Sequence, residues 1–174
     1  MHFSKNVNLF SRVPDPYDMK QRKIGVIGSG AMGGGIAQVA ATSGDEVLVF
    51  DSNIGSMQRA QKSMIASLEK LQSKGRITES AQEIAARVLF VDTIDQFAET
   101  DLVIEAVVED LKVKQEIFRQ LEKIVQKEFI LVTNTSSLSI AAISSAVSNP
   151  ENVIGIHFFN PPVLMPLVEV IPGI

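Results

Sequence analysis

The stretch from residue 23 to residue 51 constrains this chain most, because its pattern predicts an apolar strand, a glycine-rich turn, a helix and a second apolar strand. The first apolar run is followed directly by Gly-Ser-Gly-Ala-Met-Gly. In this spacing Gly28 permits a tight turn, Gly30 lets another group approach the backbone, and Gly33 lets the next helix press against the strand. We expect that helix over residues 31–43, with its N-terminus facing any anion held at the turn.

The second strand, over residues 46–50, ends at Asp51. A carboxylate about 20 residues beyond such glycines accepts hydrogen bonds from the ribose hydroxyls of a dinucleotide. It repels a 2′-phosphate, and neither Ser52 nor Asn53 is an arginine that could bind one. The whole arrangement therefore predicts NAD as the cofactor, whereas a glycine motif alone would also fit a turn that binds nothing. The predicted cofactor-binding residues of this stretch are Gly28, Gly30, Met32, Gly33 and Asp51.

The composition is that of an ordinary globular domain. The chain has 174 residues, of which 45% are hydrophobic and 21% charged, and this length suits one domain. A net charge of -4 offers no basic surface for nucleic acid or for an anionic membrane, and no apolar run is long enough to span a bilayer. Without cysteines, disulfides and thiolate metal ligands are excluded, and no metal site is expected. We expect residues 1–22 to form an exposed arm and residues 23–174 to form the domain.

Apolar patterns typical of helices and of strands alternate in the rest of the chain. A long helix is predicted over 57–73, where apolar residues recur every three or four positions, and another over 111–125. Short apolar runs at 89–91, 102–104 and 129–132 predict strands. This alternation predicts an α/β fold of the Rossmann type, in which a doubly wound, mostly parallel sheet carries helices on both faces.

Polar residues follow several of the predicted strands. Glu109 lies shortly after the strand at 102–104, residues 134–137 (Asn-Thr-Ser-Ser) follow the next strand, and His157 ends a later apolar run. Because ligands bind outside the carboxyl ends of parallel strands, one edge of the sheet could gather all of these side chains. Taken alone, residues 134–137 are best explained as a cap of the helix expected around Ile140.

His157 and Glu169 form a candidate pair. Glu169 interrupts an apolar run, where a carboxylate is costly unless it has a partner. Both residues lie equally far along the chain from Val163, in the proline-rich connection 160–166, so a simple reversal brings them together. A histidine held by a buried carboxylate has a fixed tautomer and can take a proton from an alcohol near neutral pH. Beside NAD the pair predicts alcohol oxidation, although a buried structural pair would have the same spacing.

Four sequence blocks together resemble 3-hydroxyacyl-CoA dehydrogenase over roughly residues 23–174. The block His-Phe-Phe-Asn-Pro, with Leu-Val-Glu-Val-Ile after it, is far more specific than the glycine motif. The resemblance implies oxidation of an L-3-hydroxyacyl-CoA to the 3-oxoacyl-CoA, with NAD as the acceptor. The blocks are residues 28–37, 105–109, 134–138 and 155–161.

The resemblance also implies roles for individual residues. His157 would be the general base and Glu169 its partner, while Ser136 would hydrogen-bond the reacting oxygen. Ser67 and Lys74 would contact CoA, and their spacing of seven residues puts them on one helical face, although a lysine there is also commonly a solvated charge. The residues implied to bind the cofactor at its junction with the substrate are Glu109, Lys114, Asn134 and Asn160, and Ser136 and Asn160 would also contact the substrate.

The same family continues beyond this segment into an all-helical domain that supplies dimer contacts and much of the acyl site. The resemblance therefore implies that this chain is the cofactor-binding part of a homodimeric enzyme, that it turns over acyl-CoA poorly alone, and that it exposes an apolar surface where that domain docks. Two alternatives stay open, namely another NAD-linked hydroxyacid or polyol dehydrogenase of the same superfamily and a non-enzymatic NAD-binding module. A cytoplasmic location is expected, with the mitochondrial matrix as the alternative.

Overall fold

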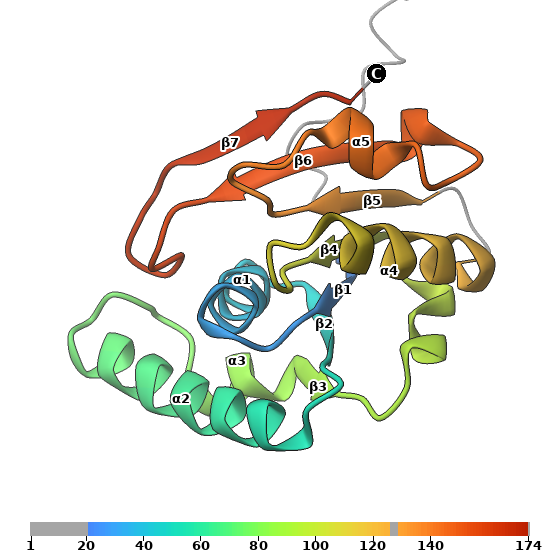
Figure 1. Ribbon diagram of the computed structural model, residues 1–174. Coiled ribbons are helices and arrows are strands. Elements are labelled where there is room, and N and C mark those ends of the chain that lie inside the picture. Colours follow the sequence, from blue (N-terminus) through green and yellow to red (C-terminus); the bar gives the residue numbers. More distant parts are fainter. Residues whose placement is uncertain (1–20, 126–128, 174) are drawn as a thin grey trace, which may run out of the picture.

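A seven-stranded sheet forms the centre of the computed structural model, which describes residues 21–125 and 129–173 (Figure 1). Six strands run parallel in the order β3-β2-β1-β4-β5-β6, and β7 pairs antiparallel with β6 at the edge. This topology confirms the predicted fold class; residues 1–20 of the predicted arm lie outside the described residues. The strands are β1 (Lys23–Ile27), β2 (Glu46–Phe50), β3 (Val88–Phe90), β4 (Leu102–Glu105), β5 (Ile130–Thr133), β6 (Val153–Phe158) and β7 (Val168–Ile171).

Helices cover both faces of the sheet, as Figure 1 shows. Each face carries its own cluster of buried apolar side chains, so the sheet is the middle layer of three. No helix in the described part of the chain is both long and apolar enough to cross a membrane. The helices on the first face are α1 (Ala31–Thr42), α2 (Ile54–Ser73) and α3 (Ala81–Ala86); those on the second are the 3-10 helix η2 (Ile94–Glu99), α4 (Leu111–Ile124) and α5 (Ile140–Ser144), and the 3-10 turn η3 (Pro150–Asn152) precedes β6.

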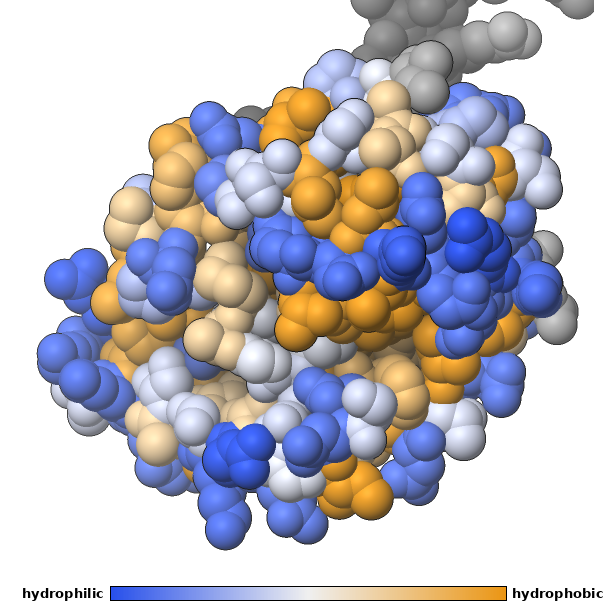
Figure 2. Space-filling view, in the orientation of Figure 1, coloured by the Kyte–Doolittle hydropathy of each residue, from blue (hydrophilic) through white to orange (hydrophobic). Residues whose placement is uncertain are grey.

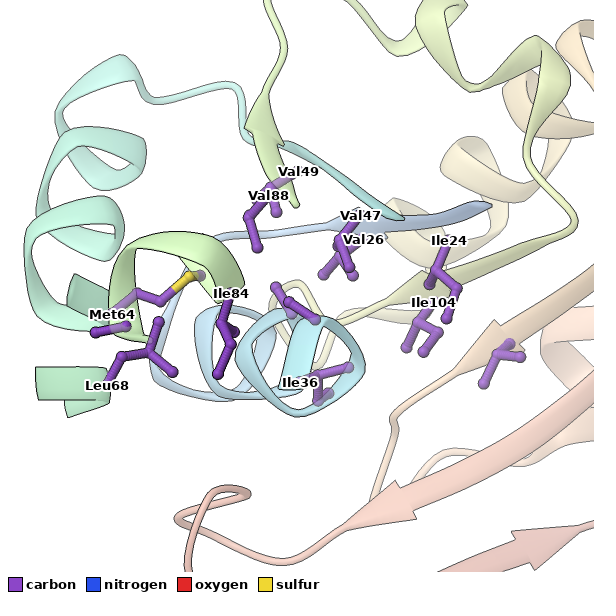
Figure 3. Packing of buried hydrophobic residues seen from close by; sticks show 14 residues of the cluster. Ile24, Val26, Ile36, Val47, Val49, Met64, Leu68, Ile84, Val88 and Ile104 are labelled. Atoms are coloured by element: carbon purple, nitrogen blue, oxygen red, sulfur yellow. The ribbon is translucent and has the colours of Figure 1, made fainter. Parts of the chain in front are cut away.

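The first core is built from the apolar faces of these helices and the strands beneath them. Ile36 of α1, Leu68 of α2 and Ile84 of α3 are almost completely buried, and Figure 3 shows them in one cluster with residues of the sheet. Val26 and Val47, on neighbouring strands, complete the contact. Because the inner strands are covered on both faces, their sequences are continuous apolar runs rather than alternating ones.

Side-chain caps explain where several helices begin. Asn53 Oδ1 accepts a hydrogen bond from Ser56 N at 3.0 Å, so α2 begins three residues before the predicted start at residue 57. Ser80 and Glu83 form a capping box for α3, which was not predicted because it is too short to show a helical period. The cap of α5 is Ser139, so the assignment of residues 134–137 as that cap was wrong.

The contact between α1 and the turn after β1 leaves no room for a side chain. The strand order reverses around β1, which pairs with both β2 and β4, and the glycine turn lies at the carboxyl end of β1. A Cβ atom added to Gly33 would lie 1.8 Å from the carbonyl oxygen of Gly28. A Cβ atom added to Gly34, the next residue of α1, would meet its nearest neighbour, the Cβ of Ala60, at 3.7 Å. Gly33 is therefore required by packing, whereas Gly34 is not.

These neighbouring glycines provide a matched test of that contact. We expect Gly33→Ala to lower the free energy of unfolding by about 1–3 kcal/mol, because the helix must move away from the turn. Gly34→Ala should leave it unchanged or raise it by up to about 1 kcal/mol, because alanine favours a helix. Urea unfolding of both variants measures the difference. Equal effects of the two substitutions would contradict the packing role of Gly33.

Candidate active site

The glycine turn is tied to the end of β2 by hydrogen bonds. Gly28 has a φ of 92°, which favours glycine, and its N–H donates to the Phe50 carbonyl oxygen at 2.9 Å. Asp51 Oδ2 accepts from both the backbone N and the Oγ of Ser29, at 2.7 and 2.8 Å, and Oδ1 accepts from Asn53 N at 2.8 Å. Asp51 is thus held beside the turn, as the sequence predicted.

Asp51 carries a negative charge near neutral pH. Partial burial acts to raise the pKa of its carboxyl, but the hydrogen bonds from Ser29 and Asn53, together with the Arg59 guanidinium, outweigh burial and lower this pKa below its ordinary value. Arg59 lies in the second turn of α2 rather than directly after β2, so the residues that follow the strand in sequence do not reveal this cation near Asp51.

The glycine turn has the shape that a bound pyrophosphate requires. A Cβ atom at Gly30 would meet no atom within 4 Å, so the backbone there is open to a ligand, and α1 begins at the next residue. The N–H groups at the start of a helix attract phosphate. The turn, the helix N-terminus and the ionised Asp51 therefore fit a dinucleotide without a 2′-phosphate.

His157 and Glu169 face each other across β6 and β7. They are direct partners in the strand register, and His157 Nδ1 lies 3.0 Å from Glu169 Oε2, so the predicted pairing is confirmed. A hydrogen bond donated by Nδ1 leaves Nε2 free to accept a proton. The Phe159 ring lies 4.8 Å from the imidazole, centroid to centroid, and packs beside it.

Glu169 is not buried, contrary to the sequence argument. Its side chain is 53% exposed and that of His157 is 24% exposed. The apolar run around Glu169 forms β7 at the edge of the sheet, where Val170 is 66% exposed, and Leu167, directly before the strand, is 55% exposed. Figure 2 shows hydrophobic residues at the surface along this upper edge, where Figure 1 places β7. This strand therefore exposes apolar side chains.

The loop after β5 connects the predicted residues at the carboxyl ends of three strands. Asn134 N donates to the Glu105 carbonyl oxygen at 2.9 Å, and its Oδ1 accepts from Phe158 N at 3.0 Å, next to His157. Asn134 therefore joins the ends of β4, β5 and β6. Asn160 is exposed and precedes Pro161 through a cis peptide bond, in the connection between β6 and β7.

Glu109 and Ser136 lie together on this edge of the sheet. Glu109 Oε1 accepts from Ser136 N and from Thr135 Oγ1, both at 2.9 Å, and lies 3.4 Å from Ser136 Oγ. Burial acts to raise the pKa of the Glu109 carboxyl, but these hydrogen bonds and the nearby Lys114 ammonium lower it below its ordinary value. Glu109 is therefore ionised at neutral pH and holds the serine loop in place.

Lys114 contacts Glu109 from inside the protein. Its side chain is 1% exposed, and its Nζ lies 3.2 Å from Glu109 Oε2 and 2.7 Å from Glu105 Oε1. Glu105 is fully buried and also accepts from Thr133 Oγ1 and Val107 N, each at 2.8 Å. The structure thus gives Lys114 a positioning role behind Glu109. Sequence reasoning missed Glu105, although an acid at the end of the apolar run 102–104 and a lysine nine residues later in an amphipathic helix indicate such a pair.

The buried pair makes a strong prediction about stability. We expect Glu105→Gln to lower the free energy of unfolding by about 3–5 kcal/mol, because it leaves the Lys114 ammonium buried beside a neutral amide. The double variant Glu105→Gln with Lys114→Met should recover much of this loss. Lys112→Met, at an exposed lysine of the same helix, should change stability by less than about 0.5 kcal/mol. Denaturant unfolding that shows equal stabilities for all three variants would contradict the buried pair.

Two neighbouring cavities lie along α1. A cavity of about 350 Å³ begins at the glycine turn and passes between α1, α2 and the connection 161–163. A second cavity of about 760 Å³ continues toward the end of α2. Pro162, in the connection 161–163, packs directly against α1, because a Cβ atom at Gly35 would lie 2.9 Å from the Cγ and Cδ of Pro162. The second cavity is lined by both residues predicted to contact CoA, Ser67 and Lys74, and by two further cations, Lys70 and Arg76.

Within residues 21–125 and 129–173, no group of three or more histidine or acidic side chains is placed to hold a metal ion. The groups that gather at the carboxyl ends of the strands are the His157 imidazole, the carboxylates of Glu169 and Glu109, and the hydroxyl and backbone N–H of Ser136. This set of groups can bind a dinucleotide and move one proton.

Comparison with known proteins agrees with this geometry. Residues 23–174 match the family model described as "3-hydroxyacyl-CoA dehydrogenase, NAD binding domain". The chain is 47% identical over 151 residues to a probable 3-hydroxybutyryl-CoA dehydrogenase of Deinococcus radiodurans, covering 87% of this chain and 54% of that protein. It is 44% identical to the 3-hydroxyadipyl-CoA dehydrogenase of Escherichia coli, with coverage of 87% and 32%.

Solved structures give the same result for the fold. The crystal structure of a 3-hydroxybutyryl-CoA dehydrogenase from Escherichia coli superposes with a TM-score of 0.83 at 43% identity, covering 87% of this chain and 32% of that one. The (S)-3-hydroxybutyryl-CoA dehydrogenase of Ralstonia eutropha superposes with a TM-score of 0.84 at 36% identity, with coverage of 89% and 55%. The chain spans about half the length, or less, of these relatives.

The family match covers the glycine turn, Asp51 and the His157–Glu169 pair, and it confirms the resemblance and the NAD cofactor predicted from the sequence. The chain belongs to the NAD-binding domain family of the 3-hydroxyacyl-CoA dehydrogenases.

Proposed function

We propose that this chain supplies the cofactor site and the catalytic base for NAD-dependent oxidation of an L-3-hydroxyacyl-CoA to the 3-oxoacyl-CoA. The observation that carries the proposal is the contact of 3.0 Å between His157 Nδ1 and Glu169, near the carboxyl end of β6. The glycine turn follows β1 of the same parallel sheet, so both lie at one edge. The printed names of the relatives describe enzymes that act on 3-hydroxybutyryl-CoA and 3-hydroxyadipyl-CoA, which supports an acyl-CoA substrate.

The residues at the carboxyl ends of the strands have separate roles in the proposed reaction. Glu169 fixes the imidazole so that Nε2 of His157 takes the proton from the substrate hydroxyl. Ser136 donates a hydrogen bond to the same oxygen, and Glu109 holds the backbone of that serine. Asn134 fixes the strand end beside His157. NAD, when bound, supplies the chemistry of hydride acceptance.

The second cavity supports CoA as the carrier of the acyl group. Lys70, Lys74 and Arg76 give it three cations, which suit the phosphates of the CoA nucleotide, and Ser67 adds a hydroxyl. The first cavity leads from there to the glycine turn. A polyol has no charge for these cations to bind, and a free hydroxyacid has a single carboxylate for the three of them. We therefore favour acyl-CoA over the other NAD-linked alcohol substrates.

The match covers 54% of the Deinococcus radiodurans relative and 32% of the Escherichia coli relative. We propose that an all-helical domain outside the matched segment provides the dimer contacts and the rest of the acyl site. The exposed apolar residues of β7 are compatible with such a neighbour.

NADH and NADPH titrations of the chain by calorimetry test the cofactor. We expect NADH to bind more tightly than NADPH, and Asp51→Ala to weaken NADH binding by roughly tenfold to one-hundredfold, because a charged hydrogen-bond acceptor of the ribose is lost. Glu69→Ala, at an exposed acid of α2, removes the same charge and should leave binding unchanged. Tighter binding of NADPH than of NADH would refute the assignment, and would point to Arg59 as a phosphate partner.

Substitution of the histidine tests the catalytic role. In a protein extended to the length of these relatives, we expect His157→Gln to lower turnover of 3-hydroxybutyryl-CoA by about 10²–10⁴-fold while NADH binding is retained. His2→Gln, at the only other histidine of the sequence, serves as the control. Retained turnover would exclude His157 as the base, and turnover of alcohols that lack CoA at the same rate would favour the wider superfamily activity. Absence of any turnover in the unsubstituted protein would favour a binding module.

A further inference from the structure

Among the residues that the structure describes, a single charged residue lines the cavity of about 350 Å³ at the glycine turn. This residue is Arg59, in the second turn of α2. Its neighbour Ala60 lies against the first turn of α1, since a Cβ atom at Gly34 would meet the Ala60 Cβ at 3.7 Å. Arg59 therefore lies on the opposite side of the cavity from the helix N-terminus that fits a phosphate.

A chain of three hydrogen bonds connects Arg59 to Asp51. Asp51 Oδ1 accepts from Asn53 N at 2.8 Å, and Asn53 Oδ1 accepts from Ser56 N at 3.0 Å. Ser56 Oγ then accepts from Arg59 Nη2 at 2.9 Å. Because Ser56 lines the same cavity, this last bond holds the guanidinium at the cavity wall.

The guanidinium has donors to spare. A guanidinium carries five N–H groups, and within the described part of the chain Arg59 gives a hydrogen bond only to Ser56. The hydrogen bonds to the Asp51 carboxylate come from Ser29 and Asn53 instead. No salt bridge between described residues involves Arg59. Its charge and its free N–H groups are therefore available to an anion.

The charges at the glycine turn favour a cation there. A bound dinucleotide brings one negative charge on each phosphate of its diphosphate, and the ionised Asp51 adds another. The N-terminus of α1 supplies only about half a positive charge, and its first turn, Ala-Met-Gly-Gly, contains no charged side chain. The planar fork of a guanidinium matches two phosphate oxygens at once, so Arg59 suits this excess of negative charge.

We propose that the Arg59 guanidinium binds the diphosphate of the dinucleotide, on the opposite side of the cavity from the N-terminus of α1. The inference needs the NAD cofactor and no part of the proposed oxidation. It adds a cofactor-binding residue that belongs neither to the glycine motif nor to the residues implied by the family resemblance. Asp51 then binds the ribose, and Arg59 offsets the repulsion between that carboxylate and the phosphates.

Calorimetric titration of the chain with NADH and with ADP-ribose tests the proposal. ADP-ribose keeps the adenosine and the diphosphate of NADH and lacks the nicotinamide. We expect Arg59→Met to weaken both ligands by the same factor, about threefold to thirtyfold, because charge-assisted hydrogen bonds to the diphosphate are lost. Lys62→Met removes the same charge from an exposed position of α2 that lines neither cavity, and it should leave both affinities unchanged.

Salt separates a phosphate contact from stacking of the guanidinium on the adenine ring. Raising the ionic strength from about 0.1 M to about 1 M shortens the Debye length from about 10 Å to about 3 Å. The factor by which Arg59→Met weakens ADP-ribose binding should therefore fall by at least about half. A factor that does not change with salt would assign Arg59 to the adenine and would overturn the proposal.

The remaining outcomes are also decisive. Unchanged binding of both ligands would mean that Arg59 has no part in holding the cofactor, and weaker binding of NADH alone would place it near the nicotinamide. A loss confined to NADPH would assign Arg59 to a 2′-phosphate. Each of these results contradicts the proposal. Absence of NADH binding by the unsubstituted chain would contradict the cofactor site itself, which is a failure distinct from that of Arg59.

Two further variants keep the test decisive if Arg59→Met does not fold. Arg59→Gln also removes the charge, suits an exposed helix position, and should cause the same loss. Arg59→Lys keeps the charge without the planar fork, so we expect it to weaken both ligands less than Arg59→Gln does. Equal losses in these two variants would contradict an interaction that depends on charge. Thermal unfolding should show that all the variants unfold at about the temperature of the parent.

Discussion

The contact between α1 and the turn after β1 is the constraint on which the rest of the site depends. Gly33 lies so close to the Gly28 carbonyl that only hydrogen atoms fit between them, and this fixes the helix N-terminus directly over the turn. The same turn receives Asp51 from the end of β2 through both donors of Ser29. The helix N-terminus and the Asp51 carboxylate are thereby held in fixed positions on the same turn by packing and hydrogen bonds.

A buried ion pair, formed by Lys114 and Glu105, fixes the structure at the end of β4. Glu105 takes hydrogen bonds from Lys114, Thr133 and Val107, and Lys114 in turn contacts Glu109 at the surface. Inside the protein, Glu105 is the partner of the Lys114 ammonium. At the surface, Glu109 contacts the same ammonium and holds the serine loop through Ser136 N. Removing water from two opposite charges is expensive, and the added hydrogen bonds to Glu105 offset part of that cost. The result is a loop whose position is set by the core.

The sequence predicted those features that depend on local pattern. The turn, Asp51 and the order of strands and helices follow from glycine spacing and apolar periodicity, and the pairing of His157 with Glu169 follows from equal distances along a hairpin. Burial was not predictable in the same way. The apolar run around Glu169 forms an edge strand. Lys114 is buried, although Lys112 and Glu116, two residues away on either side in the same helix, are exposed. Both depend on which elements become neighbours in three dimensions.

Gln38 shows a different limit of sequence reasoning. It lies in a helix of small and apolar residues, where its single amide gives no periodic signal, and a buried glutamine is usually paired within the protein. Only the three-dimensional arrangement shows that its Nε2 has no acceptor among the described groups and that it borders two cavities.

The exposure of β7 affects the strength of the contact between His157 and Glu169. Glu169 is 53% exposed on a strand where Val168 is 39% and Val170 66% exposed, so water screens its attraction to His157. Any apolar surface packed on these valines would remove water from around the pair, and the interaction between a carboxylate and an imidazolium strengthens as the local dielectric constant falls. The same contact would cover the outer edge of β7, which pairs with no further strand among the described residues. The strength of the contact between His157 and Glu169 thus depends on whatever covers β7.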